Sequence, residues 1–175
     1  MEVSTGAGLD PAFVTDWAGR YLEAWNTGDA QAIASMCSED VSWFDPGLPE
    51  TVHGRDAVRR FVEDTHRAFA GFRVEELAPP LASEHEPLVF APYRMMGTFS
   101  GRWEPLRTAP TGARFSVDGI DTWLFRGGLM CRYVTYYDSV GMARQMGVLP
   151  PLGSGTDRMM NGVQALRARF QRRSR

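Results

Sequence analysis

Two aspartates in aromatic segments are the side chains best suited to chemistry. Asp138 closes the segment VTYYD, and Asp121 lies within GIDTWLF. Successive side chains of a β-strand point to opposite faces, so Asp138 shares a face with Tyr136, and Asp121 shares one with Trp123. A carboxyl group among aromatic rings is shielded from water, and burial raises its pKa toward values useful for general acid–base catalysis. The pattern therefore predicts functional roles for both aspartates.

Each of the two aspartates also has a structural alternative. Asp138 is followed by Ser-Val-Gly, which makes it a suitable N-cap for a helix predicted at 140–146. Asp121 would face solvent if its strand lay at a sheet edge or contained a bulge. Both alternatives stay open on the sequence alone.

Three other polar residues lie where they could contact a bound substrate. Asp45 ends the strand-like segment VSWFD, where it could point into a pocket or open a turn with Pro46. His53 lies in the loop that follows and could relay a proton. Arg94, in a predicted strand, would need a carboxylate partner if it pointed inward, and would otherwise extend its guanidinium group into solvent.

Aromatic and methionine side chains would form the wall of a pocket, although most of them must belong to the core. Such a wall suits a flat, polycyclic or terpenoid-like substrate. Tyr136 or Trp25 could then donate a hydrogen bond to negative charge that develops during the reaction. The predicted substrate-binding set is Tyr21, Trp25, Trp43, Asp45, His53, Phe61, Arg94, Met95, Trp123 and Tyr136.

The composition excludes several kinds of chemistry. All 19 basic residues are arginine, so the chain has neither a Schiff-base lysine nor a phosphate-binding GKS or GKT loop. The two cysteines form no CxxC pair and are predicted to be buried, reduced thiols. The three histidines are scattered without the spacing of a metal site, so no metal is expected.

The charge is distributed unevenly along the chain. The formal net charge of −2 gives no overall attraction to nucleic acid. After Leu149, six arginines oppose one aspartate, which gives this tail +5 and leaves −7 on the remainder. The tail is predicted to be a helix that is solvated or packs on the acidic body or a partner subunit. Neither a signal segment nor an apolar run of membrane-spanning length is visible, which predicts a cytoplasmic protein with no membrane partner.

Hydrophobic periodicity predicts helices in the first half of the chain and strands in the second. A helix begins at Asp10, with aromatic residues at every fourth position, and a short helix capped by Asp29 follows. A longer helix is predicted at 55–70, and then four strand-like segments, the last two joined by a tight turn at 126–128. This order predicts an α+β domain whose helices pack on one face of a curved antiparallel sheet, forming a cone that could hold a small ligand.

Three segments together resemble the SnoaL-like branch of the nuclear transport factor 2-like superfamily. They are YLEAWNTGD, MCSEDVSWFDPGLPETVHGRDAVRRFV, and GIDTWLFRGGLMCRYVTYYD followed by MARQMG. They support one domain at 10–147, followed by a linker and basic helix at 148–175. The resemblance implies a cone-shaped α+β barrel, often dimeric, that works without metal or organic cofactor. By position, Asp138 resembles the acid/base aspartate of SnoaL cyclases and Asp121 a second polar pocket group, although no histidine lies near Asp121.

The leading hypothesis is a cofactor-independent cyclase of secondary metabolism that acts on a hydrophobic polyketide- or terpenoid-like molecule. Asp138 would be the general acid/base, and Asp121 would orient it or share its proton, so that the two titrate as a pair. The alternatives are an epoxide-opening enzyme, either hydrolase or cyclase, and a non-catalytic module for binding or dimerisation. A homodimer is expected.

Overall fold

The structure, a computed structural model, describes residues 8–173. Most of the N-terminal segment that was predicted to carry no signal lies outside these residues, as do Ser174 and Arg175 of the basic tail. Three helices come first: α1 (Pro11–Thr27), α2 (Ala30–Ser35) and α3 (Arg55–Ala68). Asp10 and Asp29 accept hydrogen bonds from the first turns of α1 and α2, and Gly28 ends α1 in the left-handed conformation. The predicted helices are thereby confirmed.

Seven strands form one curved sheet in the order β2-β1-β7-β6-β5-β3, with β4 also paired to β5. They are β1 (Cys37–Phe44), β2 (Val52–His53), β3 (Phe69–Glu76), β4 (Leu81–Ala82), β5 (Leu88–Phe99), β6 (Arg114–Arg126) and β7 (Leu129–Tyr137). The expected all-antiparallel sheet needs one correction, because β1 pairs with β7 in parallel. A parallel pair requires a long crossover, and here α3 and β3 to β6 provide it.

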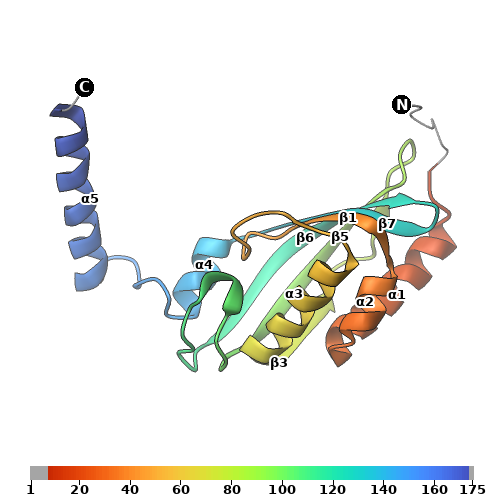
Figure 1. The fold of residues 1–175 in the computed structure, drawn as a ribbon, viewed down its shortest axis with the longest axis horizontal. Coiled ribbons are helices and arrows are strands. Elements are labelled where there is room, and N and C mark those ends of the chain that lie inside the picture. Colours follow the sequence, from red (N-terminus) through yellow and green to blue (C-terminus); the bar gives the residue numbers. More distant parts are fainter. Residues whose placement is uncertain (1–7, 174–175) are drawn as a thin grey trace.

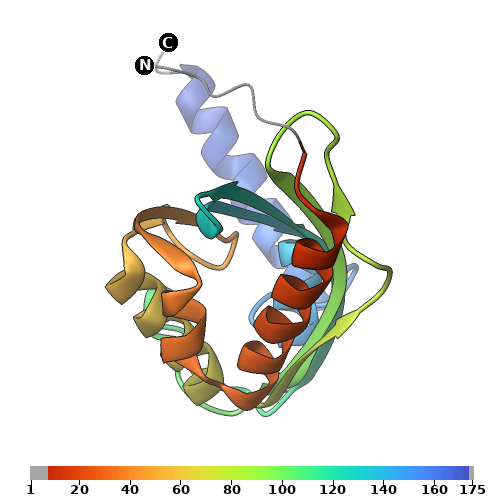
Figure 2. The ribbon, with the colours of Figure 1, turned by 90° about the vertical axis from the view of Figure 1, so that its right-hand side faces the viewer.

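The helices lie against the concave side of this sheet (Figures 1 and 2). Helix α3 contacts both β1 and β3, which lie toward opposite sides of the sheet, so it bridges the open side of the cone. Helix α1 lays its aromatic stripe on β6, where Trp17 meets Trp123 and Phe125 at ring-centroid distances of 4.9 Å. The α+β cone predicted from the sequence is therefore the observed architecture.

The hairpin between β6 and β7 sets which residues of both strands face the cone. Gly127 and Gly128 both have positive φ, as a two-residue turn of the hairpin type requires. Phe125 pairs with Met130, but the preceding residue, Leu124, pairs with Arg132. The register therefore shifts by one residue, and Cys131 is an extra residue in β7. This β-bulge decides the orientation of every later residue of β7.

Two short helices lie at one end of the cone, and the chain leaves the cone after the second of them. The short 3₁₀ helix η1 (Glu104–Leu106) and α4 (Ser139–Gln145) lie at the end of the sheet that is opposite the β6–β7 turn. Helix α5 (Gly155–Arg173) stands away from the sheet (Figure 1), and it confirms the predicted C-terminal helix. The division into a domain at 10–147 and a tail at 148–175 stays a prediction. Among the described residues, no helix is long and apolar enough to span a membrane.

Candidate active site

The concave side of the sheet and the helices that cover it surround a cavity of about 170 Å³. Most of its wall is aromatic or aliphatic, and side chains from α1, α3, β5, β6, β7 and α4 contribute to it. Two buried carboxyl groups, those of Asp121 and Asp45, interrupt this apolar wall. The cavity therefore combines the two features expected of a site for a hydrophobic small molecule: an apolar body and a few polar groups.

Asp121 lies on the inward face of β6 and is only 6% exposed. The hydroxyl group of Tyr133 donates a hydrogen bond of 2.8 Å to Asp121 Oδ1. Burial raises the pKa of Asp121 to about 7, while the nearby hydroxyl groups of Thr135 and Tyr133 lower it and the charge of Asp45 raises it further. At neutral pH this carboxyl group can thus both accept and donate a proton.

Tyr133 is held in place by a second layer of side chains. Its ring stacks on that of Trp43 at a centroid distance of 3.7 Å and an interplanar angle of 20°. Trp43 is fully buried and lies outside the cavity wall, so its predicted contact with substrate is not what the structure shows. Beside Asp121 on the partner strand, the Thr135 hydroxyl group is hydrogen-bonded to Tyr93 Oη at 2.7 Å. These contacts fix the orientation of the groups around Asp121.

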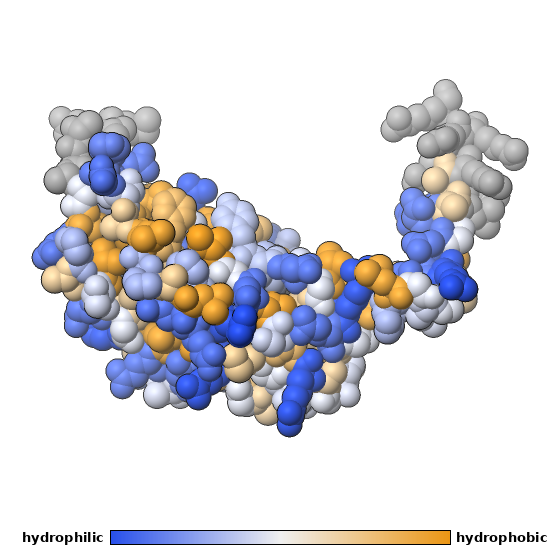
Figure 3. Space-filling model, turned by 180° about the vertical axis from the view of Figure 1, so that it is seen from behind, coloured by the Kyte–Doolittle hydropathy of each residue, from blue (hydrophilic) through white to orange (hydrophobic). Residues whose placement is uncertain are grey.

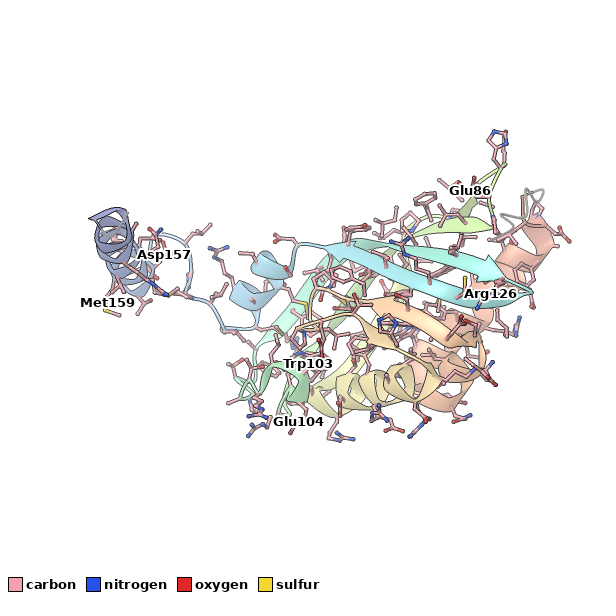
Figure 4. The ribbon with its side chains drawn as sticks, turned by 45° about the horizontal axis from the view of Figure 1, so that its top comes forward. Glu86, Trp103, Glu104, Arg126, Asp157 and Met159 are labelled. Atoms are coloured by element: carbon pink, nitrogen blue, oxygen red, sulfur yellow. The ribbon has the colours of Figure 1, made fainter. Side chains whose placement is uncertain are left out.

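Asp45 forms the second polar group of the cavity, just beyond the end of β1. Asp45 Oδ1 accepts hydrogen bonds from the Gly47 amide at 2.6 Å and from the Tyr137 hydroxyl group at 2.8 Å. Burial raises the pKa of Asp45, and these two hydrogen bonds lower it. Trp103, labelled in Figure 4, donates through Nε1 to the Gly47 carbonyl oxygen at 3.2 Å and so ties the loop before η1 to this turn. Asp45 therefore both faces the cavity and shapes the turn, which are the two alternatives that the sequence left open.

Asp138 lies outside the cavity. It is exposed, and its Oδ1 accepts a 2.7 Å hydrogen bond from the Gly141 amide, which makes it the N-cap of α4. Tyr136, on the same face of β7, is 58% exposed. The expectation that these two side chains face the cone is therefore wrong, because the bulge at Cys131 turns Tyr133 and the residues in phase with it inward instead.

Two further candidates also point away from the cavity. Arg94 forms a two-bond ion pair with Asp118 on the outer side of the sheet, at 2.6 and 2.9 Å. It is therefore the outward arginine of the two alternatives, and its place in the predicted substrate-binding set is wrong. His53 is exposed in β2, opposite Ser42 of β1, and does not line the cavity.

The remaining predicted residues do meet around the cavity. Besides the two buried aspartates, the structure brings together five side chains of the predicted set: Tyr21, Trp25, Phe61, Met95 and Trp123. Sequence reasoning missed the tyrosines of the inner wall, Tyr93, Tyr133 and Tyr137. Residues directly opposite each other in an antiparallel pair share a face, and Tyr133 lies opposite Trp123 only because of the bulge at Cys131, so the sequence held no signal for the first of the β7 tyrosines.

The described residues contain no cluster of side chains suited to bind a metal ion. Within residues 8–173, no group of three or more histidine, cysteine, aspartate or glutamate side chains is arranged to hold a metal ion. Both cysteines are free thiols; Cys37 is buried and Cys131 is partly exposed at the bulge. The polar chemistry of the cavity is therefore that of two carboxyl groups and the tyrosine hydroxyl groups around them.

Comparison with known proteins agrees with this geometry. The SnoaL-like domain family matches residues 18–133, which is more than half of the chain. The chain belongs to the SnoaL-like family. No curated protein matches its sequence.

Solved structures show the same fold at low sequence identity. TsrD from Streptomyces laurentii has a TM-score of 0.68 and 23% identity, covering 81% of this chain and 99% of that protein. AclR, a candidate hydroxylase from Streptomyces galilaeus, has a TM-score of 0.67 and 19% identity, covering 94% and 98%. A candidate polyketide cyclase from a Silicibacter species has a TM-score of 0.66 and 22% identity, covering 75% and 93%. The SnoaL-like chain thus has the nuclear transport factor 2-like fold.

Proposed function

We propose that this SnoaL-like protein is a cofactor-independent acid–base enzyme that acts on a hydrophobic polyketide- or terpenoid-like molecule. The observation that carries the proposal is Asp121, a buried carboxyl group whose pKa of about 7 suits proton transfer at neutral pH. The aromatic wall around it matches a flat, apolar substrate. Solved structures of similar fold that are described as candidate polyketide cyclases support the same reaction class.

The reaction that fits these groups best is an intramolecular carbon–carbon bond formation. The Asp121 carboxylate would remove a proton from a carbon next to a carbonyl group, and the resulting enolate carbon would attack a second carbonyl carbon of the same molecule. The alkoxide formed in this step would take the proton back from Asp121, so protons balance over the cycle. Tyr133 holds the carboxyl group in one orientation throughout.

A decisive test compares two aspartate variants. We expect wild-type protein in D₂O to exchange the α-protons of a hydrophobic ketone such as 2-tetralone, measured by NMR. Asp121→Asn should lower this rate by about 10²- to 10⁴-fold, because it removes the proton-transferring group. Asp138→Asn is the matched control and should keep the wild-type rate, because asparagine still caps a helix. An Asp121→Asn variant that exchanges like wild type would refute the assignment.

Epoxide opening is the second candidate reaction, and the presence of Asp45 in the same cavity favours it. One carboxyl group could protonate the epoxide oxygen while the other activates water, and burial raises the pKa of both. Incubation of a hydrophobic aryl epoxide that carries a hydroxyl group of its own in ¹⁸O-labelled water separates hydrolysis from internal opening, since only hydrolysis places label in the product. Binding of ketones and epoxides without any turnover would instead support the non-catalytic alternative.

We also propose a homodimer that forms through the outer face of the sheet. Phe44 on β1, Phe90 on β5 and Tyr136 on β7 are exposed apolar or aromatic residues of the strands. Orange areas in Figure 3, which views the molecule from behind, show that apolar residues gather on this surface. Sedimentation velocity should give a mass near twice 19.5 kDa, and a species of single-chain mass would refute the dimer.

A further inference from the structure

Two polar atoms in the cavity wall have no partner. Within the described residues, the buried side-chain nitrogen and oxygen atoms without a hydrogen bond belong to Tyr21, Trp43, His66, Trp123 and Arg144. Of these, only the Tyr21 hydroxyl group and the Trp123 indole N–H belong to residues that line the cavity. Their side chains are 4% and 3% exposed, so bulk water does not satisfy them. A buried donor without a partner is costly, which indicates that a ligand completes this part of the wall.

Both donors lie beside Asp121. Trp123 follows Asp121 by two residues on β6 and faces the same way. Its ring meets that of Tyr21 at a centroid distance of 5.1 Å and an angle of 63°. Trp17 stacks on Tyr21 at 5.0 Å and also meets Trp123 at 4.9 Å, so the three rings form one packed cluster that holds the phenol ring of Tyr21 in place. After burial, the charge of Asp121 is the next cause that raises the pKa of Tyr21, which places the two groups near each other.

The chemistry of these donors defines what they can bind. An indole N–H only donates, and Tyr21 stays protonated at neutral pH because its pKa is raised. Asp121 does not satisfy either of them. Neither donor atom has an acceptor at hydrogen-bond geometry among the described residues, although the Trp123 N–H lies near enough to Asp121 to lower the pKa of that carboxyl group. The missing partner is therefore an acceptor that the ligand supplies.

We propose that Tyr21 and Trp123 form a subsite that holds a carbonyl oxygen of an aromatic substrate beside Asp121. The inference rests on the proposed function and narrows its substrate class to aryl ketones and related carbonyl compounds. A carbonyl oxygen has two lone pairs and can accept from both donors at once. The carbon next to that carbonyl would then lie at Asp121, and the oxygen that gains negative charge when the proton leaves would lie at the two donors.

The test is a binding comparison that requires no turnover. Calorimetric titration measures the affinity of wild-type, Tyr21→Phe and Tyr136→Phe proteins for three ligands of similar shape. They are a ketone (2-acetylnaphthalene), a hydrocarbon (2-ethylnaphthalene) and an epoxide (2-naphthyloxirane). We expect Tyr21→Phe to weaken ketone binding by about tenfold, the effect of one lost hydrogen bond, and to leave hydrocarbon binding unchanged. Tyr136→Phe makes the same chemical change on the outer face and should alter neither affinity.

Infrared spectroscopy gives a second readout that a structural effect would not move. The carbonyl stretch of the bound ketone should lie at lower frequency in wild-type protein than in Tyr21→Phe. Equal losses for ketone and hydrocarbon, or no loss for either, would overturn the subsite. A loss confined to the epoxide would overturn the carbonyl assignment.

The outcomes also distinguish failure of the subsite from failure of the proposed enzyme. If ketone binding depends on Tyr21 but no proton exchange occurs, the subsite stands and the proposed enzyme fails. If Asp121→Asn abolishes exchange while Tyr21→Phe binds the ketone normally, the proposed enzyme stands and the subsite fails.

Discussion

Asp121 and Asp138 belong to neighbouring segments of the same part of the sheet, one within β6 and the other just after β7, and their surroundings differ in every respect. Asp121 is buried among aromatic rings and bonded to a tyrosine hydroxyl group, and its pKa is raised to about 7. Asp138 is exposed and bonded to the backbone of α4. The same side chain thus has a pKa suited to proton transfer in one place and caps a helix in the other, and only its environment distinguishes the two.

The two faces of the sheet repeat this contrast. On the inner face, polar groups are joined by buried hydrogen bonds such as Tyr93 to Thr135 and Tyr133 to Asp121. On the outer face, Arg94 and Asp118 form an ion pair that is open to solvent. Exposed ion pairs contribute little to stability, whereas a buried polar network is sensitive to the loss of any member. Substitutions on the two faces should therefore differ in both size and kind of effect.

The largest expected effect on stability is that of Asp121→Asn. Because the folded-state pKa of Asp121 lies above its unfolded value of 3.8, its contribution is most favourable below pH 3.8 and is lost as pH rises to about 7. Asparagine does not titrate, so the variant should gain stability relative to wild type by roughly 2 to 3 kcal/mol between pH 5 and pH 8. Urea unfolding of both proteins at pH 5 and pH 8 measures this gain. A difference in stability between variant and wild type that is the same at both pH values would contradict the raised pKa.

Tyr133→Phe should have an intermediate effect, and it should change the pH dependence of activity. The Tyr133 hydroxyl group lowers the pKa of Asp121, so its removal should raise that pKa further. A proton-exchange rate that depends on the Asp121 carboxylate rises with pH through the pKa, and its midpoint should shift to higher pH in the variant. An NMR rate profile from pH 5 to pH 9 tests the shift. Tyr136→Phe is the control from the outer face. A shift of the midpoint in that variant would contradict the difference between the two faces.

The smallest expected effect is that of Asp138→Ala. Removal of the N-cap of α4 should lower the free energy of unfolding by about 1 kcal/mol, while Asp138→Asn should leave it nearly unchanged. Thermal and urea unfolding of the two variants measure this difference. If alanine and asparagine have equal effects, the capping bond is not what Asp138 contributes.

Much of the fold could be predicted because its signals are local. The aromatic residues at every fourth position form the buried face of α1, the caps at Asp10 and Asp29 begin their helices, and paired glycines at 127 and 128 turn the β6–β7 hairpin. The cavity position of Asp121 also followed from a local rule, since it alternates in phase with Trp123. Each of these inferences needs only neighbours a few residues away.

The error on Asp138 has a different origin. A regular hairpin would continue from the pairing of Phe125 with Met130 and would place Asp121 opposite Val134, on one face with Tyr136 and Asp138. The structure instead pairs Asp121 with Thr135, because Cys131 forms a bulge. The composition of this hairpin does not indicate the bulge. Packing decides it, since the shifted register buries Tyr133 against Trp43 and leaves Tyr136 exposed.

The sequence by itself determined the element types, the cone and one of the two buried acids, through periodicity and turn chemistry. Tertiary structure decided which face of β7 lines the cavity, which tyrosine supports Asp121, and that Asp45 shares the same cavity. The physical reason is the two-residue repeat of a strand, in which one bulge reverses the orientation of every side chain that follows. Whether such a bulge forms depends on the burial of residues distant in sequence, so no local pattern fixes it.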